Sequence, residues 1–443
     1  MKTKVGVVSL GCDKNRVDTE VMLANLAAGG YEITPSPQDA DVIIVNTCAF
    51  LESARREAIE TSLEMAGYKK RGKCKKVIIT GCLGQKFGEE VFKELKEVDA
   101  VVGTDCYSDI CSIVSDTLNG ERKLINNCSE GITFGKRILT TAPHVAYLKI
   151  ADGCDNYCTY CLIPFIRGRY RSVPMERIVE QAAELAEQGV KELILVAQDT
   201  TRYGKDLYGE YKIVELLRRL SDINGIEWIR LLYCYPELLD EALLREIFEN
   251  PKIVNYVDIP LQHVNDEILR KMNRRSDNKS IISLFDKLSE LGIDVRSTFI
   301  CGFPGETKDT VREVESFLYK YKLRNVGFFA YSREEGTAAA KFDNQVSARV
   351  KQNYVKKLYS AQYKVAQELN RGDVGKTYKC IVDGLDEKTA DRYYVYNGRT
   401  YFMTPEIDGT VQIISKRELK VGGFYDVAIT GTYEYDLIGE VTE

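Results

Sequence analysis

The sequence predicts an α/β protein in three parts: a small doubly wound parallel sheet, a partial barrel of six βα units and a C-terminal small β-barrel. Short apolar strands alternate with helical segments from residue 4 to about residue 118. The alternation resumes over residues 146–331, after a connector that contains several glycines. A Tyr- and Gly-rich tail with an all-β pattern opens at Gly372. At 443 residues, the chain is long enough for several domains.

The first sheet is predicted from apolar runs that are each followed by a helical segment. This alternation is typical of parallel strands joined by crossover helices. The strands are KVGVVSL (4–10), DVIIVN (41–46), KVIIT (76–80) and AVV (100–102), and the helices span 18–28, 52–66 and 89–95, with a last one that ends near Leu118. We assign residues 1–120 to this domain and residues 121–143 to a linker.

The second array contains six strand signals separated by helical segments. Six βα units fall short of the eight that close a complete barrel, so a partial barrel is expected over residues 144–345. A long helix connects it, over residues 346–371, to a small β-barrel over residues 372–443. The six strands are AYLKI (146–150), ELILVAQ (192–198), WIRLLY (228–233), NYVDI (255–259), DVRSTFI (294–300) and NVGFFAY (325–331).

Composition restricts the function to few classes. The 13 cysteines are an odd number in a long chain with no export signal, so metal binding is expected rather than a disulfide scaffold. Only His144 and His263 are histidines, which makes His-rich metal sites and Ser-His nucleophiles poor candidates. No apolar run approaches eighteen residues, so a membrane span is excluded. The start of the chain indicates a cytoplasmic protein.

The strongest motif is C-x3-C-x2-C, formed by Cys154, Cys158 and Cys161 directly after the first barrel strand. Three thiolates on one short loop can bind three irons of a 4Fe-4S cluster and leave the fourth iron open. The alternative is a structural zinc site, completed by His144. The place of the loop, at the carboxyl end of a barrel strand where active sites gather, favours the cluster.

A second set of cysteines follows the strands of the first sheet. Cys12, Cys48 and Cys82 each lie just beyond the carboxyl end of a predicted strand. Because these ends share one edge of a parallel sheet, we expect the three thiols to converge there. The alternative is three partly buried core cysteines. The others show no such pattern and are expected to be packing or surface thiols: Cys74, Cys106, Cys111, Cys128, Cys234, Cys301 and Cys380.

With these motifs, the chain resembles the methylthiotransferases of the radical S-adenosyl-L-methionine (SAM) superfamily over essentially its entire length, with a tail that resembles a TRAM domain. The resemblance implies a 4Fe-4S cluster on each cysteine triplet. In that superfamily, SAM chelates the open iron of the first cluster and is cleaved to methionine and a 5'-deoxyadenosyl radical. The resemblance also implies a SAM site that includes the turn after the fifth barrel strand. If the resemblance is set aside, the alternative is that the two glycines of this turn serve only a tight βα turn. The implied SAM-site residues are Tyr160, Gln198, Gly302, Gly305 and Glu306.

Two branches of this family differ in substrate. One modifies an aspartate of protein twelve of the small ribosomal subunit, and SLGCDKNRVDTE (9–20) resembles its Gly-Cys-Pro-Lys-Asn pattern, with Asp13 where proline is usual. The tRNA adenosine branch has Gln-Met-Asn after its first ligand and Gly-Gln-Asn where this chain has Ala197-Gln198-Asp199. The first branch is therefore favoured, also by AQDTTRYG (197–204), IRLLYCYPE (229–237), DIPLQH (258–263) and AYSREEGT (330–337).

This resemblance implies a mechanism. The radical made at the Cys154/Cys158/Cys161 cluster removes a β-hydrogen from the target aspartate. The Cys12/Cys48/Cys82 cluster then presents sulfur, or a methylated sulfur species, to the carbon radical. One SAM supplies the methyl group and another the radical, without a general acid–base pair. The alternatives are a tRNA adenosine methylthiotransferase and a metal-stabilised, non-catalytic binding protein that holds zinc.

The charge of the chain is concentrated in its tail. Residues 372–443 carry 13 acidic and 8 basic side chains, while the remainder holds 53 of each sign. We therefore expect the C-terminal domain to contact a basic ribosomal protein, with RNA binding not its main role; scattered surface acids are the alternative. An electron donor is implied as a further partner. The run Arg167-Gly-Arg169-Tyr-Arg171 is a basic patch that faces an acidic target, the SAM carboxylate or solvent.

Overall fold

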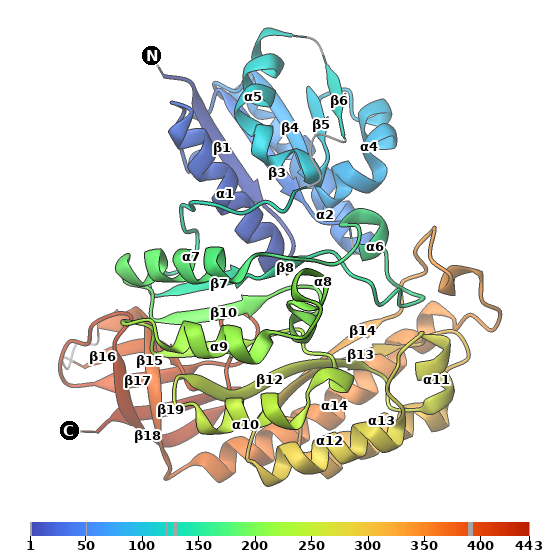
Figure 1. The fold of residues 1–443 in the computed structure, drawn as a ribbon, viewed down its shortest axis with the longest axis vertical. Helices are drawn as coiled ribbons and strands as arrows, with labels where there is room; N and C mark the ends of the chain where they lie inside the picture. The colour runs from blue at the N-terminus through green and yellow to red at the C-terminus, as the bar shows by residue number, and fades with distance from the viewer. Residues whose placement is uncertain (1, 50, 121, 127–130, 389–392, 443) are drawn as a thin grey trace.

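The computed structural model describes residues 2–49, 51–120, 122–126, 131–388 and 393–442 (Figure 1). The N-terminal α/β domain lies at the top of the view, above the partial barrel, and the C-terminal β-barrel lies at the lower left (Figure 1). Among the described residues, no helix is long and apolar enough to cross a membrane. The predicted three-part α/β architecture is confirmed.

The N-terminal sheet is parallel throughout, in the strand order β2-β1-β3-β4-β5-β6. Its central strand β3 is buried along its whole length, which explains its unbroken apolar sequence. The order reverses direction between β1 and β3, which creates a crevice at the carboxyl ends of these strands. The strands are β1 (Lys4–Ser9), β2 (Glu32–Ile33), β3 (Val42–Thr47), β4 (Lys76–Gly81), β5 (Ala100–Val102) and β6 (Lys123–Ile125).

Two helices of this domain begin earlier than the sequence pattern predicts. Helix α1 begins at Asp13 rather than at Asp18, and α4 begins at Cys82 rather than at Glu89. Strand β6, in the segment predicted as a linker, pairs with β5 and so belongs to the first sheet. The helical elements are α1 (Asp13–Ala28), α2 (Glu52–Ala66), α3 (Tyr68–Arg71), α4 (Cys82–Glu94), η1 (Thr104–Asp109) and α5 (Ile110–Asn119).

The barrel sheet is parallel and follows chain order, β7-β10-β11-β12-β13-β14, without closing on itself. All six predicted strands are present: β7 (Val145–Lys149), β10 (Glu192–Val196), β11 (Trp228–Leu231), β12 (Ile253–Gln262), β13 (Asp294–Cys301) and β14 (Asn325–Ala330). Between them lie α7 (Met175–Glu187), η2 (Thr200–Arg202), α8 (Lys205–Tyr208), α9 (Ile213–Ser221), η3 (Pro236–Leu238), α10 (Glu241–Glu249), α11 (Asp266–Lys271), α12 (Asn278–Glu290) and α13 (Lys308–Tyr321). A short 3-10 turn, η4 (Ala339–Lys341), follows the last strand.

The cysteine loop of the barrel is closed by a small hairpin. Strand β8 (Ala151–Asp152) pairs antiparallel with β9 (Arg171–Ser172), and the loop between them holds α6 (Ile163–Ile166). The ends of this loop are therefore fixed to each other as well as to β7.

The C-terminal domain is a closed barrel in the order β15-β16-β17-β19-β18, reached through the long helix α14 (Ala348–Asp373). It covers one face of the barrel sheet: Tyr147, Ile194 and Trp228 belong to the same hydrophobic core as Val382 and Val427. Alternate residues of the same strands, such as Leu148 and Leu195, pack against the helices instead. The strands are β15 (Thr377–Lys388), β16 (Tyr394–Arg399), β17 (Val411–Ser415), β18 (Phe424–Tyr433) and β19 (Asp436–Val441).

Candidate functional site

The loop after β7 brings Cys154, Cys158 and Cys161 together as free thiols. Burial, with a smaller contribution from the neighbouring Cys158 sulfur, raises the pKa of Cys154 to about 11. Burial also raises the pKa of Cys161, to which Cys158 and Cys154 both add. Backbone hydrogen bonds hold the loop, from Cys154 N to Gly168 O at 3.1 Å and from Cys161 N to Cys158 O at 3.0 Å. The predicted first triplet is thus a compact group on one loop.

The second triplet comes from three separate segments of the N-terminal domain. Cys12 precedes α1, Cys48 follows β3 and Cys82 is the first residue of α4. Burial raises the pKa of Cys82 to about 12; Arg167 opposes this shift, while Cys12 and Cys48 add to it. Gly11 has φ 93°, and a Cβ there would lie 2.7 Å from Cys48 Cβ, so these two loops are in contact. The three thiols lie close together, at the carboxyl ends of β1, β3 and β4.

Asn15, which the sequence reasoning did not single out, ties these segments to one another. Its Nδ2 donates to Leu10 O at 3.2 Å and to Thr47 O at 2.9 Å, the carbonyls near Cys12 and next to Cys48. Its Oδ1 accepts from Cys82 Sγ at 3.8 Å. The side chain is fully buried. One amide therefore sets the mutual position of all three cysteine segments.

The described residues show no ready-made site for a single metal ion. Among the described residues, no three His, Cys, Asp or Glu side chains converge as one metal ion requires. A zinc ion needs its ligands about 2.0–2.3 Å from one centre, whereas each thiolate of a 4Fe-4S cluster binds a different iron. His144, the fourth ligand in the zinc alternative, lies at the other end of β7 and contacts Asp383 at 2.8 Å. This geometry does not favour the alternative in which His144 completes a zinc site on the first triplet.

The predicted SAM-site residues form two groups. Tyr160 packs edge-on against Phe303 at 6.4 Å between ring centroids, in the turn where Gly302 and Gly305 have φ of 76° and 88°. The Glu306 carboxylate accepts from Gly302 N and contacts His263 Nε2 at 3.1 Å, so it shapes this turn.

Gln198 forms the second group, at the base of the cysteine loop. Its Nε2 donates to Asp152 Oδ1 at 3.1 Å, while its Oε1 is buried and has no hydrogen-bond partner among the described residues. A buried acceptor without a donor is a place that a ligand can satisfy. The chemistry of Gln198 therefore fits contact with a bound molecule.

An arginine lies beside each triplet. Arg167 Nη2 is 3.9 Å from Cys82 Sγ, and Arg274 Nη1 is 3.9 Å from Cys158 Sγ. Arg274 is buried and stacks 4.2 Å from the ring centroid of Tyr235. No sequence signal marked Arg274. The run at 167–171 was noted, but it is not one patch, because Arg167 is buried and the Arg169 side chain is 85% exposed to solvent.

The other described cysteines belong to neither triplet. Cys74, Cys234, Cys301 and Cys380 are buried thiols and Cys111 is half-buried, as expected of packing residues. Cys106 is disulfide-bonded, so the expectation of a thiol there is wrong. Cys128 lies outside the described residues.

Family models match each of the three parts. Residues 148–318 match the radical SAM superfamily, residues 4–103 match the uncharacterized protein family UPF0004, and residues 374–442 match the TRAM domain. The fold and the cysteine loop therefore define the chain as a radical SAM enzyme with an added cysteine-bearing domain and a TRAM domain.

Comparison with curated relatives identifies the family within the radical SAM superfamily. A protein of Clostridium kluyveri named ribosomal protein uS12 methylthiotransferase RimO is 47% identical over 445 residues, which cover 99% of this chain and 98% of the relative. A protein of the same name from Acetivibrio thermocellus is 47% identical over 100% of this chain and 99% of its own length. The chain belongs to the RimO family of ribosomal protein uS12 methylthiotransferases.

Solved structures share the fold at low sequence identity. The radical SAM methyltransferase TsrM from Kitasatospora setae has a TM-score of 0.55 at 16% identity, covering 74% of this chain and 75% of that one. The cobalamin-dependent SAM radical enzyme OxsB has a TM-score of 0.52 at 13% identity, covering 84% and 61%. These likenesses support the fold alone.

Proposed function

We propose that this chain adds a methylthio group to the β-carbon of an aspartate in ribosomal protein uS12. The observation that carries the proposal is the presence of two cysteine triplets on either side of one domain junction, in a chain that matches relatives of that name over its full length. A reaction that combines radical formation with sulfur donation needs two sulfur-ligated centres, and two facing domains can provide them. We place this activity in the cytoplasm.

The residues present fit two clusters and SAM. Cys154, Cys158 and Cys161 would hold one 4Fe-4S cluster, and Cys12, Cys48 and Cys82 would hold the other. When bound, the first cluster and SAM supply the radical, and the second cluster supplies the sulfur that is inserted. Gln198 Oε1 offers an acceptor to SAM, and the Tyr160 ring lies beside the 302–306 turn that would close the same pocket.

The protein's own contribution is to exclude water and to place charge. Cys154, Cys158 and Cys82 are buried, so part of each triplet is kept from solvent, while Cys12 is exposed. Arg274 and Arg167 each direct a guanidinium at one sulfur, which compensates part of the negative charge that thiolate ligands bring into a buried site. The proposed reaction also requires an external electron donor.

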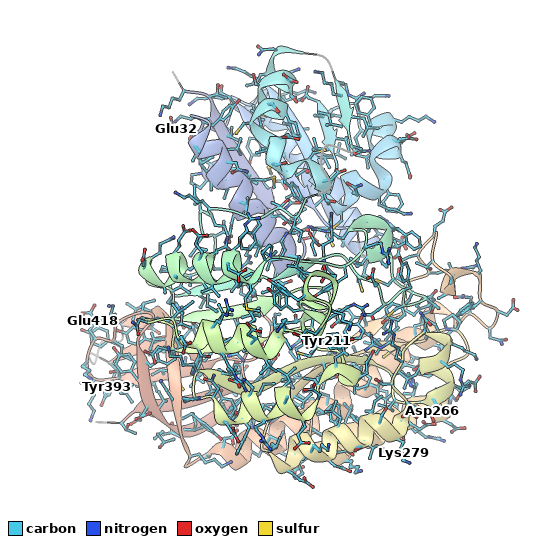
Figure 2. All side chains as sticks on the ribbon, viewed as in Figure 1. Glu32, Tyr211, Asp266, Lys279, Tyr393 and Glu418 are labelled. Carbon is cyan, nitrogen blue, oxygen red and sulfur yellow. The ribbon has the colours of Figure 1, made fainter. Side chains whose placement is uncertain are left out.

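The substrate surface that we propose is the exposed acidic part of the TRAM domain. Several acids of this domain are already paired: Asp408 contacts Arg296 at 3.1 Å, Asp373 contacts Arg324 at 2.6 Å and Glu406 contacts Arg16 at 2.7 Å. The charge available to a basic partner is therefore smaller than the composition indicates. Glu418 lies at the outer edge of this domain, away from the N-terminal domain (Figure 2). Among the described residues of this domain, the exposed acids apart from the paired Glu406 are Asp386, Glu387, Glu418, Asp426, Glu434 and Glu440.

The test uses protein reconstituted anaerobically with iron and sulfide and assayed with SAM and a chemical reductant, which takes the place of the electron donor. Isolated uS12 and tRNA are offered separately, and each is examined by mass spectrometry of its peptides or nucleosides. We expect modification of one aspartate in uS12 and none in tRNA. The triple variant Cys154→Ala/Cys158→Ala/Cys161→Ala is the matched control and is expected to be inactive. Modification of tRNA alone, or stoichiometric zinc without iron in the anaerobically purified protein, contradicts the proposal.

A further inference from the structure

We propose that Arg167 is a positioning residue that donates an N–H···S hydrogen bond to Cys82 in the second cluster and thereby raises the reduction potential of that cluster. This inference rests on the proposed function, because it requires a cluster on Cys12, Cys48 and Cys82. It links the two halves of the site: Arg167 follows the first triplet by six residues in the chain but contacts the second.

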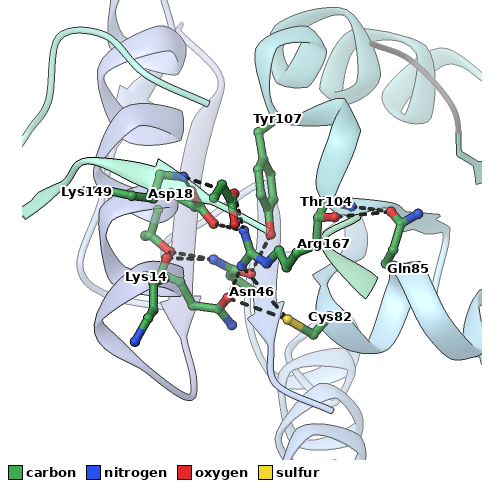
Figure 3. Close-up of polar contacts among 12 residues, drawn as sticks. Lys14, Asp18, Asn46, Cys82, Gln85, Thr104, Tyr107, Lys149 and Arg167 are labelled. Carbon is green, nitrogen blue, oxygen red and sulfur yellow. Dashed lines mark hydrogen bonds and ion pairs between the residues drawn. The ribbon is translucent and has the colours of Figure 1, made fainter. Parts of the chain in front are cut away.

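Arg167 crosses the junction between the barrel and the N-terminal domain (Figure 3). Its Nη1 contacts Asp18 Oδ2 at 2.7 Å and Asp152 Oδ2 at 3.2 Å, one carboxylate from each domain. Its Nη2 donates to Asn15 Oδ1 at 2.6 Å and lies 3.9 Å from Cys82 Sγ. A planar guanidinium held at three other points has little freedom to turn away from the sulfur.

The arrangement of charges around Arg167 favours the contact with sulfur. Lys149 bonds the same two carboxylates, so Asp18 and Asp152 are compensated by two cations, all four groups being buried. Both carboxylates bond the Nη1 side of the guanidinium, whereas the Nη2 side faces the neutral Asn15 amide and Cys82. The Cys82 sulfur therefore faces the part of the Arg167 guanidinium that no carboxylate neutralises.

Binding of iron makes this contact stronger. As a thiol, Cys82 donates to Asn15 Oδ1 at 3.8 Å. As an iron ligand it is a thiolate, which can only accept hydrogen bonds, and Arg167 is placed to donate. Hydrogen bonds and positive charge at cluster sulfurs favour the more negative, reduced state. Loss of Arg167 is therefore expected to lower the midpoint potential.

The same network leads back to the SAM side. Asp152 also accepts from Gly153 N at 2.9 Å and from Gln198 Nε2 at 3.1 Å, through its other oxygen. A single carboxylate thus connects the loop of the first triplet, the predicted SAM contact Gln198 and the arginine at the second triplet. Arg167 is therefore tied through Asp152 to the loop of the first triplet, as well as to the N-terminal domain through Asp18 and Asn15.

The experiment isolates the second cluster in the full chain. Cys154→Ala/Cys158→Ala/Cys161→Ala protein is reconstituted with iron and sulfide, its iron content is measured, and the midpoint potential and electron paramagnetic resonance spectrum of the remaining cluster are recorded. The same measurements are made after adding Arg167→Gln, and, as matched control, Lys149→Gln, which removes an equal charge from the same network without removing the donor at sulfur.

We expect Arg167→Gln to lower the potential and alter the spectrum at unchanged iron content, and Lys149→Gln to shift the potential by less. If Arg167→Gln does not fold, Arg167→Lys provides the test, because it keeps the positive charge but removes the guanidinium donor at the sulfur. The midpoint potential of the Arg167→Lys cluster is expected to lie below that of the triple-alanine protein that retains Arg167. An unchanged potential in the Arg167 variants, or equal shifts for Arg167→Gln and Lys149→Gln, overturns the inference while leaving the second cluster in place. Failure of the parent to bind iron overturns the second cluster and the inference together.

Discussion

Single residues determine how the second triplet is assembled. Its cysteines are far apart in sequence and lie on three separate segments, two loops and the first turn of α4, which need a connection to keep one mutual position. Asn15 provides that connection through both ends of its amide, with donors to two loops and an acceptor for the third. Because the amide is fully buried, its partners have no water to replace it.

Asn15→Ala is expected to lower the free energy of unfolding by about 2–3 kcal/mol, since the carbonyls of Leu10 and Thr47 lose a buried donor. In the background that lacks the first triplet, it is also expected to lose most of its iron. Chemical denaturation and iron analysis check these two results. Asn119→Ala, at an exposed helix end, is the matched control and is expected to keep both the stability and the iron content of the protein. Full iron content in Asn15→Ala protein contradicts this role.

In the first sheet, a helix begins at or directly after two of the three cysteines: Cys12 immediately precedes α1, and Cys82 is the first residue of α4. Helix α4 starts at Cys82, immediately after Gly81, whose φ is 94°. A Cβ at Gly81 would overlap the Asn46 side chain and the Thr47 carbonyl, so only glycine lets β4 pass this close to β3. The chain can therefore turn sharply from strand into helix with the thiol at the sheet edge.

Gly81→Ala is expected to be more destabilising than the same change at Gly30, which has a similar φ of 88° but open space around its Cβ position. Gly30→Ala measures the backbone strain alone, about 1–2 kcal/mol. Gly81→Ala adds a steric clash of about 1–3 kcal/mol. Thermal or denaturant unfolding of the two variants provides the comparison, together with iron content at the second triplet. Equal stabilities would show that the close approach of β3 and β4 is not required.

At the scale of the whole molecule, a buried ion network joins the TRAM domain to the face of the barrel sheet. Glu192 on β10 contacts Arg230 at 2.8 Å and Arg399 at 2.7 Å. Arg399 continues to Asp383, which also contacts His144 at 2.8 Å. Burial raises the pKa of Asp383, but the hydrogen bond with His144 and the attraction of Arg399 outweigh it, so the pKa is lowered overall.

Since its pKa is lower in the folded state, Asp383 contributes stability that is present above its unfolded pKa of about 3.9 and is lost as the pH falls through the folded value. Asp383→Asn is therefore expected to destabilise the metal-free protein by about 1–3 kcal/mol at pH 7, with a difference from the parent that shrinks below pH 4. Fluorescence of Trp228, the only tryptophan, reports this interface because its ring packs 4.9 Å from Phe424. Asp386→Asn, exposed on the same strand, is the control; a difference that does not change with pH would contradict this reasoning.

Much of the fold followed from local sequence patterns. All six barrel strands and the four main strands of the first sheet were predicted, because a strand buried on both faces reads as an apolar run whatever surrounds it. Strand β6 was missed, since its sequence KLI is short, begins with an exposed lysine and lacks the fully apolar run of β5, and its pairing depends on the free edge of β5. The first turns of α1 and α4 were missed because their sequences show no amphipathic pattern. Lys14 and Asn15 are polar residues at the start of α1, and Gly84 and Gly88 interrupt the start of α4.

The sequence by itself determined the three-part α/β fold, the two cysteine triplets and the family, because strand periodicity, cysteine spacing and motifs are local properties of the chain. The assignment of ligands to clusters stays a prediction. Only the tertiary structure decided that the TRAM domain covers the sheet face and that part of its acidic charge is consumed there. It also placed Arg167 and Arg274 at the sulfurs, since whether an arginine is solvated or buried against a thiol depends on chain segments more than 80 residues away.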